Sequence, residues 1–114
     1  MTLIVNNRPD GEAPDEPQDA EIEAAARAAG LDYVAIPVGQ GGFAAPQVDA
    51  MATALTATSG KTLAYCRSGT RSTLLWSLAR AKLGDAPDVL KAKANAAGYD
   101  LTPVAALLGM LAKP

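Results

Sequence analysis

The residues best suited to chemistry form one short segment, Cys66-Arg67-Ser68-Gly69-Thr70-Arg71-Ser72. The run Thr62–Tyr65 before it predicts a buried strand, and the apolar spacing after it predicts a helix over 71–83. A thiol at a helix N-terminus meets free amide N–H groups and the positive end of the helix dipole. Such surroundings lower a thiol pKa from about 8.5 toward roughly 3.5–7.5. We therefore expect Cys66 to be a thiolate nucleophile.

The rest of this segment is suited to holding an anion. Arg71 is expected to be the principal clamp, because a guanidinium offers fork-shaped donors to an oxyanion. Gly69 can take a positive φ, which lets neighbouring amides point inward, and Ser72 can donate its hydroxyl to the thiolate or to the anion. The predicted anion-binding residues besides Arg71 are Arg67, Ser68, Gly69, Thr70, Ser72 and Arg8. The alternatives are a buried structural cysteine beside a surface turn and, for Arg8, packing against loop carbonyls.

Composition narrows the chemistry further. The chain has no histidine and one cysteine, so it can form neither a Ser-His-Asp triad nor an internal disulfide, and Cys66 must be activated by something other than imidazole. With 10 basic and 12 acidic side chains and no basic block, nucleic acid is not an expected partner. We expect no metal, no organic cofactor and no membrane span, and we place the protein in the cytoplasm.

The elements that must position this segment alternate along the chain. Strands are predicted at Thr2–Val5, Tyr33–Val38 and Thr62–Tyr65. Helices are predicted at Ala20–Ala29, Val48–Ala57 and 71–83, then from a cap at Asp85–Asp88 to Ala97, and from Thr102 to Leu111. This alternation predicts a single α/β domain over residues 1–114, with a three- or four-stranded, mainly parallel sheet flanked by helices. In such folds ligands bind at the carboxyl ends of the strands, which is where Cys66 lies.

The spacing of the segment distinguishes two chemistries. Four residues separate Cys66 from Arg71, as in the active loop of rhodaneses, whereas the loop of tyrosine and dual-specificity phosphatases has five. A phosphatase also protonates its leaving group with an acid. The expected position for that acid, the loop 39–46, contains no carboxylate, which leaves Asp10 and Glu12 as candidates. Acidic residues in Pro- and Gly-containing loops such as theirs are usually only solvated, which is the stronger interpretation of both. Transfer of sulfur through a cysteine persulfide needs no such acid.

Most of the chain resembles one family. The segments NNRPDGE (6–12), EIEAAARAAGLDYVAIPV (21–38), LAYCRSGTRSTLLW (63–76) and KANAAGYDL (93–101) are similar to the phosphatase-like domain of beta-lactamase-hydrolase-like proteins. The resemblance implies a protein-tyrosine-phosphatase-like fold of the dual-specificity type. Members are also labelled sulfur transferases and can be fused to metallo-beta-lactamase-type domains. They usually carry a further strand and helix before the NNRPDGE strand, so the sheet here is expected to be incomplete or to pair with another chain.

Together these observations predict a cysteine-dependent enzyme acting on a small anion. Sulfur transfer from a sulfane sulfur donor is the first expectation, and hydrolysis of a phosphate ester is the alternative. A second alternative is a non-catalytic module that binds anions or senses redox state. A homodimer, or association with a metallo-beta-lactamase-type protein, is the expected assembly.

Overall fold

The computed structural model describes residues 2–9, 19–39, 42–58, 60–66 and 69–111. Within them the elements follow the order β1 (Leu3–Asn6), α1 (Asp19–Ala28), β2 (Asp32–Ala35), α2 (Ala45–Ala57), β3 (Thr62–Tyr65), α3 (Thr70–Lys82), α4 (Pro87–Ala96), a 3₁₀ turn (Thr102–Val104) and α5 (Ala105–Leu111). The predicted α/β class with a parallel sheet is confirmed, and the sheet has three strands. No helix in the described ranges is long and apolar enough to cross a membrane.

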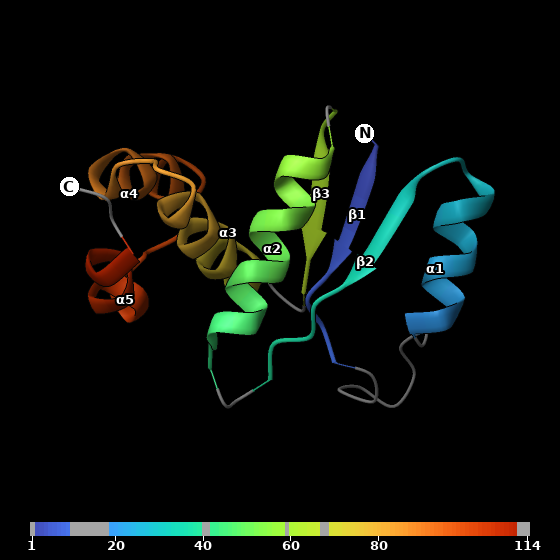
Figure 1. Ribbon diagram of the computed structural model, residues 1–114, viewed down its shortest axis with the longest axis horizontal. Helices are drawn as coiled ribbons and strands as arrows, with labels where there is room; N and C mark the ends of the chain where they lie inside the picture. The colour runs from blue at the N-terminus through green and yellow to red at the C-terminus, as the bar shows by residue number, and fades with distance from the viewer. Residues whose placement is uncertain (1, 10–18, 40–41, 59, 67–68, 112–114) are drawn as a thin grey trace.

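The sheet has the order β2-β1-β3, and both pairings are parallel. In register, Val5 of β1 lies between Val34 of β2 and Ala64 of β3. Parallel neighbours require crossover connections, which α1 and α2 provide. All three carboxyl ends consequently point toward one edge of the molecule, toward which the arrowheads in Figure 1 are directed. The segments that leave this edge include Asn7, Ile36–Val38 and Cys66.

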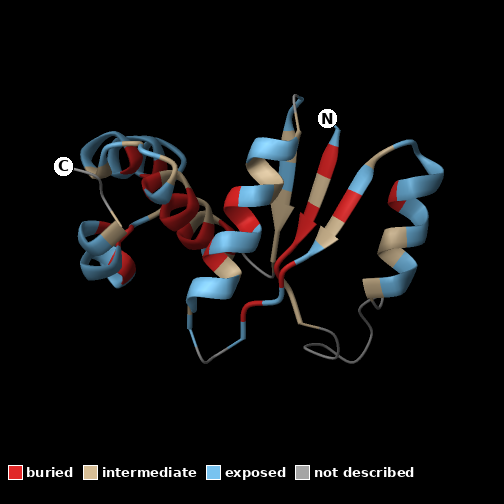
Figure 2. Cartoon of the chain, in the orientation of Figure 1, coloured by how far each residue is buried: buried red, intermediate tan, exposed pale blue. Residues whose placement is uncertain are grey.

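The core surrounds α3, the central helix, and includes buried residues of the sheet, α2, α4 and α5. Contacts join α3 to β3, α2, α4 and α5, and α1 lies beside β2 on the other side of the molecule (Figure 1). Because α3 is surrounded, side chains are buried around much of its circumference, as the red segments of Figure 2 show. Leu75 and Leu78 are completely buried, and Ala79 and Ala81 allow neighbouring helices to approach closely.

Element boundaries differ from expectation where proline is involved. The second strand ends at Ala35 rather than Val38, because the regular ladder stops there: Ile36 and Val38 are two residues apart but bond to adjacent residues at the end of β1. Hydrogen bonding nevertheless continues beyond it, since the amides of Ile36 and Val38 donate to the carbonyls of Asn6 and Asn7. Helix α2 begins at Ala45, three residues earlier than predicted, with Pro46 in its first turn, where a missing N–H costs nothing.

The end of α3 is joined to the following turn by a two-point ion pair. Arg80 Nε and a terminal guanidinium nitrogen donate to the two carboxylate oxygens of Asp85 at 2.8 and 3.0 Å. This hydrogen bonding holds the pKa of Asp85 below its usual value and raises that of Arg80. A carboxylate with a lowered pKa adds stability above its unfolded pKa of about 3.9, and that stability is lost as the pH falls through the folded value.

We expect Asp85→Asn to reduce the free energy of unfolding by about 0.5–1 kcal/mol at pH 7, and the difference from wild type to narrow as the pH falls below about 4. Urea unfolding from pH 7 to pH 3 measures this. Glu23→Gln is the control, because its ion pair with Arg27 is more exposed and should contribute less. An equal loss of free energy of unfolding at pH 7 and at pH 3 would contradict the view that the Asp85 carboxylate stabilises the protein through Arg80.

Candidate active site

Cys66 follows the last residue of β3 directly and lies just before the N-terminus of α3. Its side chain is half-buried. The backbone N–H of Gly69 donates to Cys66 Sγ at an N···S distance of 3.1 Å. Gly69 is the N-cap of α3, a helix of 13 residues, so this amide lies at the positive end of the helix dipole. Both the hydrogen bond and the dipole favour the thiolate over the thiol.

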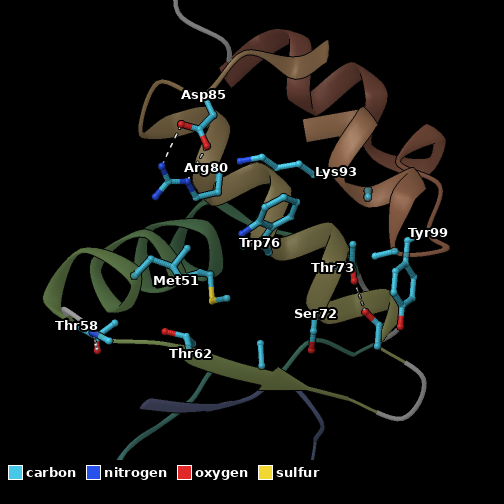
Figure 3. Close-up of a pocket in the computed structure, with 16 residues that line it drawn as sticks. Met51, Thr58, Thr62, Ser72, Thr73, Trp76, Arg80, Asp85, Lys93 and Tyr99 are labelled. Atoms are coloured by element: carbon cyan, nitrogen blue, oxygen red, sulfur yellow. Dashed lines mark hydrogen bonds and ion pairs between the residues drawn. The ribbon is translucent and has the colours of Figure 1, made fainter. Parts of the chain in front are cut away.

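Gly69 has a φ of +86°, a conformation that other L residues rarely adopt. A Cβ at this position would also collide with the hydroxyl of Tyr99, which comes from the segment after α4. Figure 3 shows this tyrosine directed toward the start of α3. The Gly69 carbonyl accepts hydrogen bonds from the N–H and the hydroxyl of Thr73, at 2.9 and 2.7 Å. The turn that presents an amide to the sulfur is therefore held by its own helix and lies close against a distant segment.

Arg71 lies in the first turn of α3 and reaches across the strand ends. One of its terminal guanidinium nitrogens donates to the Val38 carbonyl at 2.7 Å. This bond ties the predicted anion clamp to the segment that leaves β2. Since Val38 is 1% exposed, the carbonyl is a fixed anchor for the guanidinium.

The other predicted site residues have varied positions. Thr70 is the first residue of α3 and is exposed, whereas Ser72 is buried and donates its hydroxyl to Asn7 Oδ1 at 2.8 Å. Arg8 is half-buried beyond β1 at the same edge of the sheet, and its amide donates to Asn6 Oδ1. Four predicted residues lie outside the described residues: Arg67, Ser68, Asp10 and Glu12.

A second polar cluster lies between the end of β1, the side of β2 and the start of α1. The hydroxyl of Tyr33 donates to the carboxylate of Asp19, and Asn6 Nδ2 donates to Tyr33 Oη at 3.0 Å. Burial raises the pKa of Tyr33 above its usual value, and the hydrogen bond to Asp19 raises it further. Asp19 is the first residue of α1, and its carboxylate joins that helix to the sheet.

Beside the start of α3 there is a cavity of about 670 Å³ between α2, β3, α3 and α4 (Figure 3). Gly69, Ser72 and Tyr99 line one end, and Arg80 and Lys93 line the other. Met51 and Trp76 are among its apolar lining residues. Among the residues that the structure describes, no group of three or more His, Cys, Asp or Glu side chains is arranged to hold a metal ion.

Two residues at the site were not anticipated from the sequence, Asn7 and Tyr99. A polar side chain directly after a buried strand was an available signal for Asn7, because strand ends in parallel sheets form ligand sites. Tyr99 has no comparable local signal. It follows Cys66 by more than 30 residues, and its contact with Gly69 depends on how α4 packs against α3.

Comparison with known proteins agrees with this geometry. The profile of the phosphatase-like domain of beta-lactamase hydrolase-like proteins matches residues 1–83. The chain belongs to this family. A beta-lactamase hydrolase-like protein of Xylella fastidiosa is 38% identical over 99 residues, which cover 86% of this chain and 23% of the relative. A protein of the same description from Agrobacterium fabrum is 37% identical over 78 residues, covering 68% and 18%. The chain therefore spans less than a quarter of the length of these relatives.

Solved structures show the same fold. A candidate phosphatase from Neisseria meningitidis superimposes with a TM-score of 0.79 at 31% identity, covering 97% of this chain and 79% of that one. A candidate phosphatase from Shewanella putrefaciens gives a TM-score of 0.66 at 24% identity, covering 97% and 72%. The expected phosphatase-like fold is thus confirmed for this member of the family.

We expect Gly69→Ala to cost more stability than Gly30→Ala, although both replace a glycine of positive φ. Gly30 has open space at its Cβ position, so its replacement should cost only the backbone term of about 1–2 kcal/mol. Gly69→Ala adds the collision with Tyr99 and displaces the amide that faces Cys66. Urea unfolding and the rate of Cys66 alkylation by iodoacetamide at pH 7 measure the two effects. Equal losses of stability with unchanged alkylation rates would refute this role for Gly69.

Proposed function

We propose that this chain is a cysteine-dependent phosphatase that hydrolyses small phosphate monoesters at Cys66. The observation that carries the proposal is the hydrogen bond from the Gly69 amide to Cys66 Sγ at the N-terminus of α3, in a chain of a phosphatase-like family. A helix N-terminus stabilises a thiolate and also attracts the phosphate group that the thiolate must attack. The N-terminus of α3 can thus stabilise the thiolate nucleophile and also bind the phosphate group of the substrate.

The proposed reaction has two steps. In the first, the Cys66 thiolate attacks phosphorus, a P–S bond forms, and the P–O bond to the leaving group breaks. In the second, water attacks the phosphocysteine, the P–S bond breaks, and inorganic phosphate leaves with the thiolate restored. Arg71 would bind the equatorial oxygens, where charge is spread in the transition state. Its bond to the Val38 carbonyl fixes the direction from which the guanidinium approaches.

The leaving oxygen needs a proton unless it belongs to a good leaving group such as a phenolate. Asp10 and Glu12 remain the proposed donors. Asp49, an acidic residue in α2, forms an ion pair with Lys82 of α3. Because of this ion pair, the proposed scheme gives Asp49 a structural role and does not use it as the proton donor to the leaving group.

Sulfur transfer is the second candidate, because the gap of four residues between Cys66 and Arg71 is that of a rhodanese loop. Here the thiolate attacks the outer sulfur of thiosulfate, the S–S bond breaks, and sulfite leaves. Cyanide then takes the outer sulfur of the cysteine persulfide as thiocyanate, which restores the thiolate. No proton donor is needed. The proposed substrate in either case is a small anion, and a cytoplasmic location with a homodimer or a metallo-beta-lactamase-type partner remains the proposed setting.

We expect the purified chain to hydrolyse an aryl phosphate and Cys66→Ser to lose at least about 10³-fold in kcat. Arg71→Lys keeps the charge but lacks the planar fork, so we expect about a 10²-fold loss. Assays with thiosulfate plus cyanide run in parallel. Thiocyanate formation that requires Cys66, without phosphate release, would replace the phosphatase proposal by sulfur transfer. Inactivity in both assays, together with bound phosphate in calorimetry, would favour a non-catalytic anion-binding module.

A further inference from the structure

Asn7 is a buried polar residue that contacts every strand end around the site. It lies directly after β1 and is 0% exposed. Its N–H donates to the Tyr65 carbonyl at 2.8 Å, and its carbonyl accepts from the Val38 N–H at 2.9 Å. Its side chain donates through Nδ2 to the Ile36 carbonyl at 2.9 Å and accepts through Oδ1 from the Ser72 hydroxyl at 2.8 Å. All of its hydrogen-bonding groups are therefore used within the protein.

Three of these partners either adjoin a residue of the proposed site or bond to one. Tyr65 precedes Cys66 in the chain, and Ser72 follows Arg71 in the first turn of α3. Val38 donates to Asn7 through its N–H and accepts from Arg71 through its carbonyl. Asn7 is thus connected to the strand that carries the nucleophile, to the helix that carries the guanidinium, and to the backbone anchor of that guanidinium.

We propose that Asn7 is the positioning residue of the Cys66 site. It holds the first turn of α3, and with it the Gly69 amide and the Arg71 guanidinium, in a set position relative to Cys66. The part of this inference that concerns turnover rests on the phosphatase proposal. The part that concerns the reactivity of Cys66 does not, because a thiolate can be titrated without any substrate.

An asparagine side chain fits this position because of its chemistry. The amide carries a donor and an acceptor in one rigid plane, so it can bond to Ile36 on one side and to Ser72 on the other. Aspartate would keep the acceptor but lose the donor, and it would bring a buried negative charge close to the thiolate. Alanine would leave the Ile36 carbonyl and the Ser72 hydroxyl buried with a bond missing, which costs about 1–3 kcal/mol for each group.

The neighbouring Asn6 shows that burial alone does not explain the arrangement. It is also buried, at 3% exposed, but successive side chains alternate between the faces of a strand. The Asn6 side chain accordingly bonds to Tyr33 and Asp19 at the start of α1, not to α3. Of these two adjacent asparagines, Asn7 is the one whose side chain bonds to α3.

The test titrates Cys66, the one cysteine of the chain, by measuring its rate of iodoacetamide alkylation from pH 4 to pH 10. We expect Asn7→Asp to shift the midpoint upward and to slow alkylation at neutral pH about tenfold, the effect of one pKa unit. Asn7→Ala and Ser72→Ala should each slow it, and the double variant should be no slower than Asn7→Ala, because the two side chains act through one bond. The kcat for an aryl phosphate should fall in parallel, with KM changing less.

Ser77→Ala is the matched control. Ser77 is as buried as Asn7 and lies on α3, but its hydroxyl donates to the Leu74 carbonyl within the helix. It should lower the midpoint of thermal unfolding and leave the alkylation profile unchanged. If Asn7→Ala fails to fold, Asn7→Asp and Ser72→Ala decide the question. Folded Asn7 and Ser72 variants with the profile of wild type would overturn the proposal. Shifted profiles in a protein that turns over neither substrate would refute the phosphatase function and support the role of Asn7.

Discussion

The structure depends on one constraint, that β1 pairs in parallel with a strand on each side. Parallel pairing prevents a tight turn between neighbours, so the chain must cross over through α1 and α2 before it returns. The crossovers bring three carboxyl ends to one edge. Residues far apart in sequence, such as Asn7, Val38 and Cys66, meet there. The location of the site is therefore determined first by the direction of the strands, and the side chains present there determine its chemistry.

Electrostatics at this edge follow from the same arrangement. The chain contains no histidine, so no imidazole of this chain can activate Cys66. Because β3 leads directly into α3, the helix N-terminus lies next to the sulfur, and the Gly69 amide faces it. Fixed dipoles of this kind need no reorganisation as charge develops. The two candidate reactions share this machinery and differ in whether a leaving oxygen must be protonated.

Local signals in the sequence predicted the central part of the fold. The strand Thr62–Tyr65 was predicted with its observed bounds, and each end of α3 was predicted within one residue. The apolar run before the polar loop indicated the strand, and the helical spacing of apolar residues after the loop indicated the helix. Boundaries near Pro37 and Pro46 were less accurate, because the end of β2 depends on its register with the end of β1, and a proline is equally compatible with a loop and with the first turn of a helix. The last predicted helix starts as a 3₁₀ turn over Thr102–Val104.

The site was predicted in part. Cys66, Gly69 and Arg71 could be chosen because they are close in sequence and their residue types suggest the chemistry. The bonds of Arg71 to Val38 and of Ser72 to Asn7 join residues 33 and 65 positions apart. Such contacts are set by sheet order and helix packing, which residue spacing alone does not encode. Arg67, Ser68, Asp10 and Glu12 remain sequence predictions.

The position of β3 at the edge of the sheet has a consequence for local stability. In the described part of the chain β3 is bonded to one strand, whereas β1 is bonded to two, and Leu63 of β3 is 44% exposed. Opening β3 breaks one ladder, but opening β1 breaks both. In native-state hydrogen exchange, the amides of β3 should therefore exchange through smaller openings than those of β1. Cys66, the proposed nucleophile, therefore follows a strand that is expected to open at a lower free-energy cost than β1.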